Sequence, residues 1–447
     1  MLIGPPGARA RPHPWWTPVR IVLAFAVVTF ALTAVAKAPC ARGGSDAAWW
    51  NTPRDFANLC ASDLPDAYTS GGLAEGVLPL SDSGGRFEPR GQTAPIAVVA
   101  YATAQVTRVL SGSPDTSLRE GQSTEVLAES APVRGEAVTY VGLSALVQLL
   151  AFLIAIRCLM SAVPGRNPRW ALPLAAAPVI ILAGLIAWDF IGVALACATV
   201  WAWLRTRPVA AGVLGGLATA TAVWPLAILV AILAVAGRAG RTADAVRAVG
   251  SAVVTWVAIN LVAFVSTSGS SNEYAVDYLT RSTGEGTLWR LFAGLGLPVS
   301  PPVASIIMFS VLALAALGLF AHGTRVSWGE QSRAIGAVVF VALVVVAVVG
   351  KTYEPAQALW MLPFVVLGMA GRTNAARDLL IWQGFEGFAI VAFWWHAGGY
   401  TLSISGDDPI YFASILLRLA AEIWMAWRVL SLGAARACPV NCWCRVG

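Results

Sequence analysis

The stretch IVLAFAVVTFALTAVA, residues 21–36, is the first of many uncharged apolar runs in this chain, and these runs decide the fold. Each comes close to the ~20 residues that a helix needs to cross the hydrocarbon core of a bilayer. Hydrophobic residues make up 57% of the 447 residues and charged residues only 12%, against roughly 25% in soluble domains. We therefore expect an all-α polytopic membrane protein in which residues 1–447 form a single transmembrane domain.

The apolar runs predict about ten membrane-spanning helices. They lie near residues 19–36, 138–156, 171–188, 190–204, 244–265, 303–320, 334–349, 355–369, 379–396 and 411–430. Two further stretches do not fit this alternation, namely 93–110 and 208–236, the second interrupted by Trp224-Pro225. Each is either a broken or re-entrant segment buried against protein, where interrupted backbone is tolerated, or a crossing that raises the total to about twelve.

The arginines predict the orientation, because short loops rich in Lys and Arg stay cytoplasmic. This pattern places both termini and the tail at 431–447 in the cytoplasm. It places the loop at 37–92 and the turn that begins at Lys351 on the extracytoplasmic side of the cell membrane. The net charge of +6 follows from this topology and indicates no nucleic-acid partner. Residues 37–40 fit a signal-peptide cleavage site poorly, so we expect the first helix to be retained.

Cys40 and Cys60 both lie in this first outer loop, where oxidising conditions allow a disulfide. Two unpaired thiols packed under the loop are the alternative. Elsewhere, the glycines within 212–216 sit inside an apolar run, where small residues favour close packing of helices.

No motif of a soluble enzyme is present: the chain has no Walker loop, no HExxH, no GxSxG and no dinucleotide-binding glycine pattern. The sequence indicates no cofactor and no cluster of metal ligands. Ionisable residues near the outer face are therefore the candidates for function, because charge against hydrocarbon is costly and is normally functional or paired. They are Asp63, Asp66, Glu75, Asp189, Glu273, Asp277, Arg281, Arg290, Lys351, Glu354, Glu386 and His396.

Three of these candidates have a structural alternative. Asp189 fits a turn residue between two spans, and Glu386 fits a hydrogen bond to a neighbouring helix. His396 follows Trp394-Trp395 and fits an aromatic belt at the membrane interface.

Several segments together resemble a known family. They are CASDLPDAY at 60–68 with GVLP at 76–79, KTYEPAQALWMLP at 351–363, LIWQ at 380–383 and WWHAGGY at 394–400. The chain is similar in these places to actinobacterial polyprenol-phosphate-mannose-dependent mannosyltransferases, which are multi-span glycosyltransferases of the GT-C class. The resemblance implies a GT-C-like helix bundle and transfer of a sugar, with mannose expected, from a polyprenyl-phosphate donor to a lipid or cell-envelope glycan.

The resemblance also implies roles for individual residues. An Asp of the first outer loop serves as general base, and it matches Asp63, with Asp66 as the other candidate. Lys351 would hold the lipid phosphate, helped by Arg281 or Arg290. Further substrate-binding residues are expected at Tyr68, Asp189, Tyr353 and Gln357. The implied reaction inverts the sugar centre and needs no metal.

Three alternatives remain open at this level. Asp63 could instead cap a short helix that begins at Leu64-Pro65. The whole chain could be a transporter or flippase for lipids or sugars, although its ionisable residues gather at one face. It could also be a membrane scaffold that has lost catalysis.

Overall fold

A computed structural model describes residues 15–41, 50, 52–80, 87, 92–266, 280–325, 330–400 and 408–434 of the chain. Every regular element in these residues is a helix, so the predicted all-α fold is confirmed. Six helices in this described part of the chain are long and apolar enough to cross a membrane, as expected for a polytopic membrane protein. The predicted tail at 431–447 and the candidates Glu273 and Asp277 lie wholly or largely outside the described residues.

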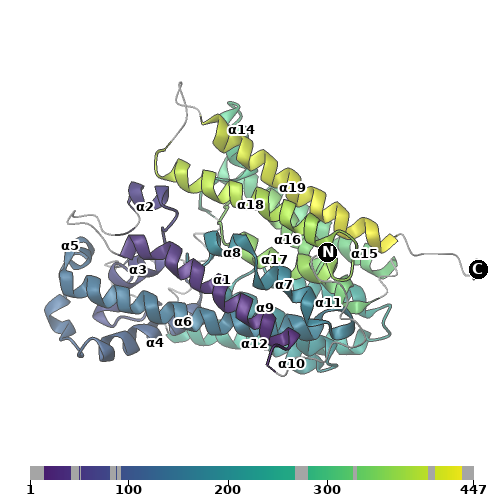
Figure 1. Cartoon of the computed structure of the whole chain (residues 1–447), viewed down its shortest axis with the longest axis horizontal. Helices are drawn as coiled ribbons and strands as arrows, with labels where there is room; N and C mark the ends of the chain where they lie inside the picture. Colours follow the sequence, from purple (N-terminus) through teal and green to yellow (C-terminus); the bar gives the residue numbers. More distant parts are fainter. Residues whose placement is uncertain are drawn as a thin grey trace, which may run out of the picture.

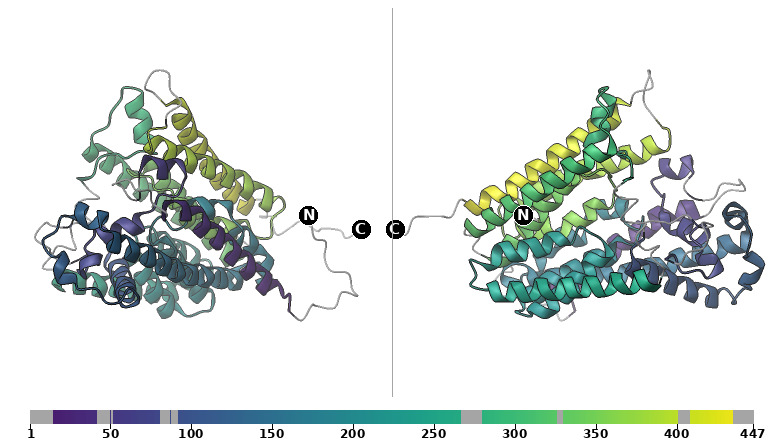
Figure 2. Two further views of the ribbon diagram at one scale, coloured as in Figure 1. Left: turned by 60° about the vertical axis from the view of Figure 1, so that its left-hand side comes forward. Right: turned by 180° about the vertical axis from the view of Figure 1, so that it is seen from behind.

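The helices form two layers (Figures 1 and 2). The lower layer in Figure 1 holds α1 (Pro18–Ala41), α4 (Ala94–Leu110), α6 (Ala131–Ala162), α9 (Asp189–Leu204), α10 (Pro208–Thr221) and α12 (Thr242–Ser266). The upper layer holds α14 (Leu288–Gly294), α15 (Pro301–Arg325), α16 (Gln331–Val349), α18 (Ala375–Ala397) and α19 (Pro409–Ala434). Short helices α2 (Pro53–Ala57), α3 (Asp63–Thr69) and α5 (Thr124–Glu129) gather at the left end.

The core lies between the layers, where α7 (Leu172–Ala175), α8 (Pro178–Ala183), α11 (Leu226–Ala236) and α17 (Gln357–Met369) pack. Helix α17 is buried along nearly its whole length. It contacts α16 in the upper layer and α9 in the lower layer. One continuous apolar cluster therefore joins both layers through α17.

Glycines allow α10 and α12 to approach closely. A Cβ atom at Gly212 would overlap the carbonyl of Ala248, and one at Gly216 would overlap the carbonyl of Ala252. The predicted packing role of the glycines in 212–216 is thus confirmed, because only a residue without a side chain fits there.

The predicted span at 171–188 is wrong as a single helix. Residues 168–183 form three short helical pieces, and residues 184–188 are not helical. Pro168, Pro173 and Pro178 each stand in the first turn of one piece. Because proline lacks the amide hydrogen that a continuing helix needs, each one ends the hydrogen-bond ladder before it.

The remaining predicted spans fall into two groups. Six coincide with the six long apolar helices, namely α1, α6, α12, α15, α16 and α19. The spans at 190–204 and 355–369 are the shorter apolar helices α9 and α17, and the span at 379–396 is the 23-residue helix α18. Helix α18 carries Asp378 and Glu386, which lowers its hydropathy.

The two stretches that did not fit the alternation have different structures. Residues 94–110 form one uninterrupted helix, α4. Residues 208–236 are broken as predicted, because Ala222 is extended and α11 begins only after Trp224-Pro225. Whether either stretch crosses the membrane stays a prediction.

We expect the first outer loop and the Lys351 turn (residues 351–356) to lie together on the extracytoplasmic side. Single cysteines at Ser81, which lies outside the described residues, and at Thr352 should both react with a membrane-impermeant maleimide added outside intact cells. A cysteine at Arg207, in an arginine-rich loop, should react only after permeabilisation. The tail cysteines are replaced by serine to remove background. Labelling of positions 81 and 352 from opposite sides would contradict the topology.

Candidate active site

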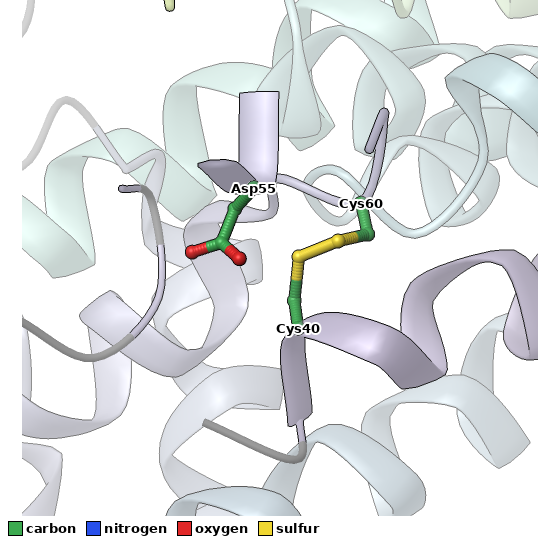
Figure 3. A group of neighbouring side chains, drawn as sticks. All are labelled: Cys40, Asp55 and Cys60. Atoms are coloured by element: carbon green, nitrogen blue, oxygen red, sulfur yellow. A yellow bond between two sulfur atoms is a disulfide. The ribbon is translucent and has the colours of Figure 1, made fainter. Parts of the chain in front are cut away.

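The first outer loop is fastened to the end of α1. Cys40 on α1 and Cys60 on the loop form a disulfide with a Cα–Cα distance of 5.8 Å, which confirms the predicted pairing (Figure 3). Beside it, the buried Lys37 donates through Nζ to the carbonyl oxygens of Ala61 at 2.8 Å and Leu59 at 3.3 Å. Lys37 was not among the predicted site residues; a lone cation at the end of an apolar run was its only signal.

Asp55 lies next to the disulfide, and with Cys40 and Cys60 it makes a group of three potential metal ligands (Figure 3). Both sulfur atoms are consumed by the disulfide, whereas metal binding uses thiolates. The Asp55 carboxylate accepts hydrogen bonds from the amide and hydroxyl of Thr52, at 3.0 and 2.8 Å. This pairing begins α2, so the chemistry of the three residues fits a structural clamp and does not fit a metal centre.

Helix α3 presents Asp63 at its first position. Ser62 is the cap: its Oγ accepts from the amide of Leu64 at 3.3 Å and donates to the Leu185 carbonyl at 2.7 Å. The amide of Asp63 donates to the Ile186 carbonyl at 2.9 Å. The capping role considered for Asp63 therefore belongs to Ser62, and the Asp63 side chain is exposed.

The other two candidates on α3 face the protein itself. Asp66 accepts a hydrogen bond from Ser70 one turn later. Tyr68 is fully buried, and its hydroxyl donates to Glu136 at 2.8 Å. Burial, followed by this hydrogen bond, raises the pKa of Tyr68. Glu136 also pairs with Arg119 at 2.6 Å, so we assign Tyr68 to the support of α3.

Three carboxylates from distant parts of the chain interact electrostatically, and we call Asp63, Asp189 and Glu354 the three-carboxylate site. Glu354 is exposed, yet the surrounding protein dehydrates its carboxylate and raises its pKa to about 7. The negative charges of Asp189 and Asp63 add to this rise, and the charge of Arg281 opposes it. The three side chains are therefore close enough to influence one another's charge.

Asp189 is oriented by an aromatic pair. It is the first residue of α9, and its Oδ1 accepts from the indole nitrogen of Trp360 at 2.8 Å. Trp360 stacks on Trp224 with ring centroids 5.8 Å apart. The break in the stretch 208–236 thus positions Trp224, which stacks on Trp360. Trp360 in turn orients the carboxylate of Asp189.

The Lys351 turn joins the loop at residues 281–287. Lys351 is fully buried, and its Nζ donates to the Arg281 carbonyl at 3.2 Å. Its own carbonyl accepts from the amide of Gly284 at 2.7 Å. Lys351 therefore holds the backbone of this loop through a buried hydrogen bond. The side chain of Arg281 is an exposed cation whose charge acts on Glu354.

Tyr353 and Gln357 belong to the interior of this turn. Tyr353 is buried against the ring of Phe393, with centroids 5.4 Å apart. Gln357 is buried at the start of α17 and donates to the Thr352 carbonyl at 3.2 Å. The structure places both beneath the turn, where they shape it.

The last candidates have other contacts or positions in the structure. Arg290 on α14 pairs with Glu285 at 2.8 Å, and His396 stacks on Tyr411 with ring centroids 3.8 Å apart. Glu386 is buried within α18 beside α19. Glu75 ends the short helical turn Leu73–Glu75.

No protein-family model and no curated protein matches this chain. The mannosyltransferase resemblance therefore stays a prediction, and a function has to be argued from the site.

The raised pKa of Glu354 predicts a pH-dependent effect on stability. Because its pKa moves from 4.5 to about 7 on folding, the folded protein holds this proton more tightly than the unfolded chain. Stability from this group is thus greatest below about pH 4.5 and declines as the pH rises to about 7. Glu354→Gln should raise the melting temperature above that range and leave it unchanged in acid.

The matched control is Glu129→Gln, at an exposed position on α5. Its melting temperature should follow that of the wild type at every pH. An equal effect of Glu354→Gln in acid and in base would contradict the origin of the shift.

Proposed function

We propose that the protein is a membrane glycosyltransferase that moves a sugar from a polyprenyl-phosphate donor to a lipid or glycan hydroxyl at the outer face. The observation that carries the proposal is the exposed Asp63 carboxylate at the start of α3, which interacts electrostatically with Asp189 and with Glu354, the carboxylate that Arg281 also influences. A base for the acceptor and a cation for the leaving phosphate are the two groups that this reaction requires.

The proposed step is a direct displacement at the sugar carbon. Asp63 takes the proton of the acceptor hydroxyl while the hydroxyl oxygen forms a bond to C1 of the sugar. The bond from C1 to the phosphate oxygen breaks, and its electron pair leaves with the polyprenyl phosphate. Attack from the side opposite the phosphate inverts the configuration at C1.

Two features favour Asp63 over Asp66 as the base. Asp63 is exposed, whereas one Asp66 oxygen accepts a hydrogen bond from Ser70 on the same helix. Asp63 also interacts electrostatically with Asp189 and Glu354, the other two members of the three-carboxylate site. A base held at a helix end by the Lys37 and disulfide contacts needs little rearrangement before reaction.

Arg281 is the cation best suited to the phosphate. The leaving phosphate gains a negative charge as its bond to C1 breaks. A guanidinium can bind two phosphate oxygens at once. The buried ammonium of Lys351 would act through the Arg281 backbone that it holds. In this proposal, Lys351 positions the phosphate site and Arg281 contacts the phosphate.

Asp63→Asn should lower transfer roughly 10²–10⁴-fold, because it removes the base and keeps the shape of the side chain. Transfer is measured in proteoliposomes with labelled polyprenyl-phosphate mannose, and a chelator should not change the rate. Asp66→Asn is the matched control on the same helix and should keep nearly full activity. Full activity in Asp63→Asn would refute this assignment. Wild-type protein without transfer from any polyprenyl-phosphate sugar would favour the scaffold or transporter.

Arg281→Ala should raise the KM for the donor roughly 10–100-fold with a smaller effect on kcat, because a hydrogen bond to a charged group contributes about 1.5–3 kcal/mol. Lys351→Met should also raise the KM for the donor. Arg290→Ala is the matched control, because Arg290 pairs with Glu285. An unchanged donor KM in Arg281→Ala, or an equal rise in Arg290→Ala, would contradict this phosphate site.

A further inference from the structure

Two carboxyl groups and one guanidinium are enclosed between α18 and α19. Glu386 is 1% exposed, Arg418 is 1% exposed and Glu422 is 0% exposed. The nearest nitrogen–oxygen pair, Arg418 Nη1 and Glu422 Oε1, is 3.7 Å apart, which is longer than a hydrogen bond. An ionised carboxylate in such a place is stable only when its charge is balanced.

The charges of this group do not balance if both glutamates are ionised. One guanidinium would then face two carboxylates, and its Nη2 already donates to the Gly286 carbonyl at 2.9 Å. The buried Asp378, also on α18, has the opposite arrangement. It lies 2.6 Å from Arg428 and 3.0 Å from Arg377, so two guanidinium groups serve one carboxylate.

Most of the carboxyl oxygens in this group accept no hydrogen bond. Among the residues that the structure describes, none donates to either oxygen of Glu422 or to Oε1 of Glu386. The Glu386 and Glu422 side chains nevertheless interact with each other, and the Trp382 side chain interacts with Glu386. Ionised carboxylates only accept hydrogen bonds, so a bond between them requires a proton. Water could satisfy single oxygens, but it would leave the excess negative charge in place.

The titratable groups that face the pair are few. Arg418 lies 3.9 Å from the centre of the Tyr353 ring, and its charge also interacts with Tyr411. Trp382 on α18 is a polar neighbour of Glu386. Since Tyr353 and Tyr411 are neutral phenols in the ordinary pH range, Arg418 is the cation against which the two carboxyl groups must balance.

We propose that Glu386 and Glu422 form a proton-binding site, in which one proton is shared between the two carboxyl groups and the single remaining negative charge balances Arg418. The group is then neutral inside the bundle. Arg418 stays charged and can hold both the Gly286 carbonyl and the Tyr353 ring, which belong to the two segments that meet at the Lys351 turn.

Infrared spectroscopy of the full-length protein in proteoliposomes tests this site, because a protonated carboxyl group has a carbonyl band that shifts in heavy water. The pH is set well above about 7, so that Glu354 and all exposed carboxyl groups are ionised. Wild-type protein should retain a band that corresponds to one carboxyl group per chain. Glu386→Gln and Glu422→Gln should each lose it, since the remaining carboxylate then pairs with Arg418.

Asp378→Asn is the matched control, because Asp378 is paired with two arginines and should contribute no such band. Arg418→Met should roughly double the band, since two carboxyl groups without a cation would both be protonated. The wild-type spectrum alone decides the proposal if a variant fails to fold. Absence of the band in wild-type protein, or its survival in both glutamine variants, would overturn the proton site.

Discussion

Carbonyl groups at the ends of interrupted helices hold the loops around the three-carboxylate site. A helix leaves its last carbonyls without intrahelical partners, and in an apolar bundle each of them needs a donor. The carbonyls of Leu185 and Ile186, exposed by the break before α9, accept from Ser62 and from the amide of Asp63. The Val349 carbonyl at the end of α16 accepts from the indole of Trp289 at 3.1 Å. The loops are therefore bound where the helices stop.

This arrangement explains how a mostly apolar chain can hold a polar site rigidly. Each carboxylate of the three-carboxylate site belongs to a segment that is fixed by a separate contact: the disulfide and Lys37 for α3, Trp360 for α9, and the Gly284 amide for the Lys351 turn. None of these contacts uses the carboxylate of Asp63.

Two other buried acids in the bundle are paired with arginines. The Arg119–Glu136 pair lies beneath α3, and the Asp378 carboxylate is enclosed by Arg377 and Arg428. In each case a buried acid has a cation within hydrogen-bond distance, as burial of charge demands. The two acids that share only Arg418 differ from both pairs in this respect.

The sequence alone determined the features that depend on local chemistry. Apolar runs specify a helical membrane protein, Trp224-Pro225 interrupts a helix, and the loop that Cys40 and Cys60 share favours a disulfide. The prediction of one helix at 171–188 was wrong because hydropathy measures only how apolar a segment is. It does not register that closely spaced prolines interrupt the backbone hydrogen bonds of a helix.

Only the tertiary structure decided which ionisable residues meet. Lys351 and Tyr68 look like outer-face polar residues in the sequence, yet packing turns both side chains inward. Lys37 and Glu354 join the site because helices far apart in the chain bring them to one place. Hydropathy and motif spacing are local properties, whereas the partner of a charged side chain is set by helix packing, which the order of residues along the chain does not reveal.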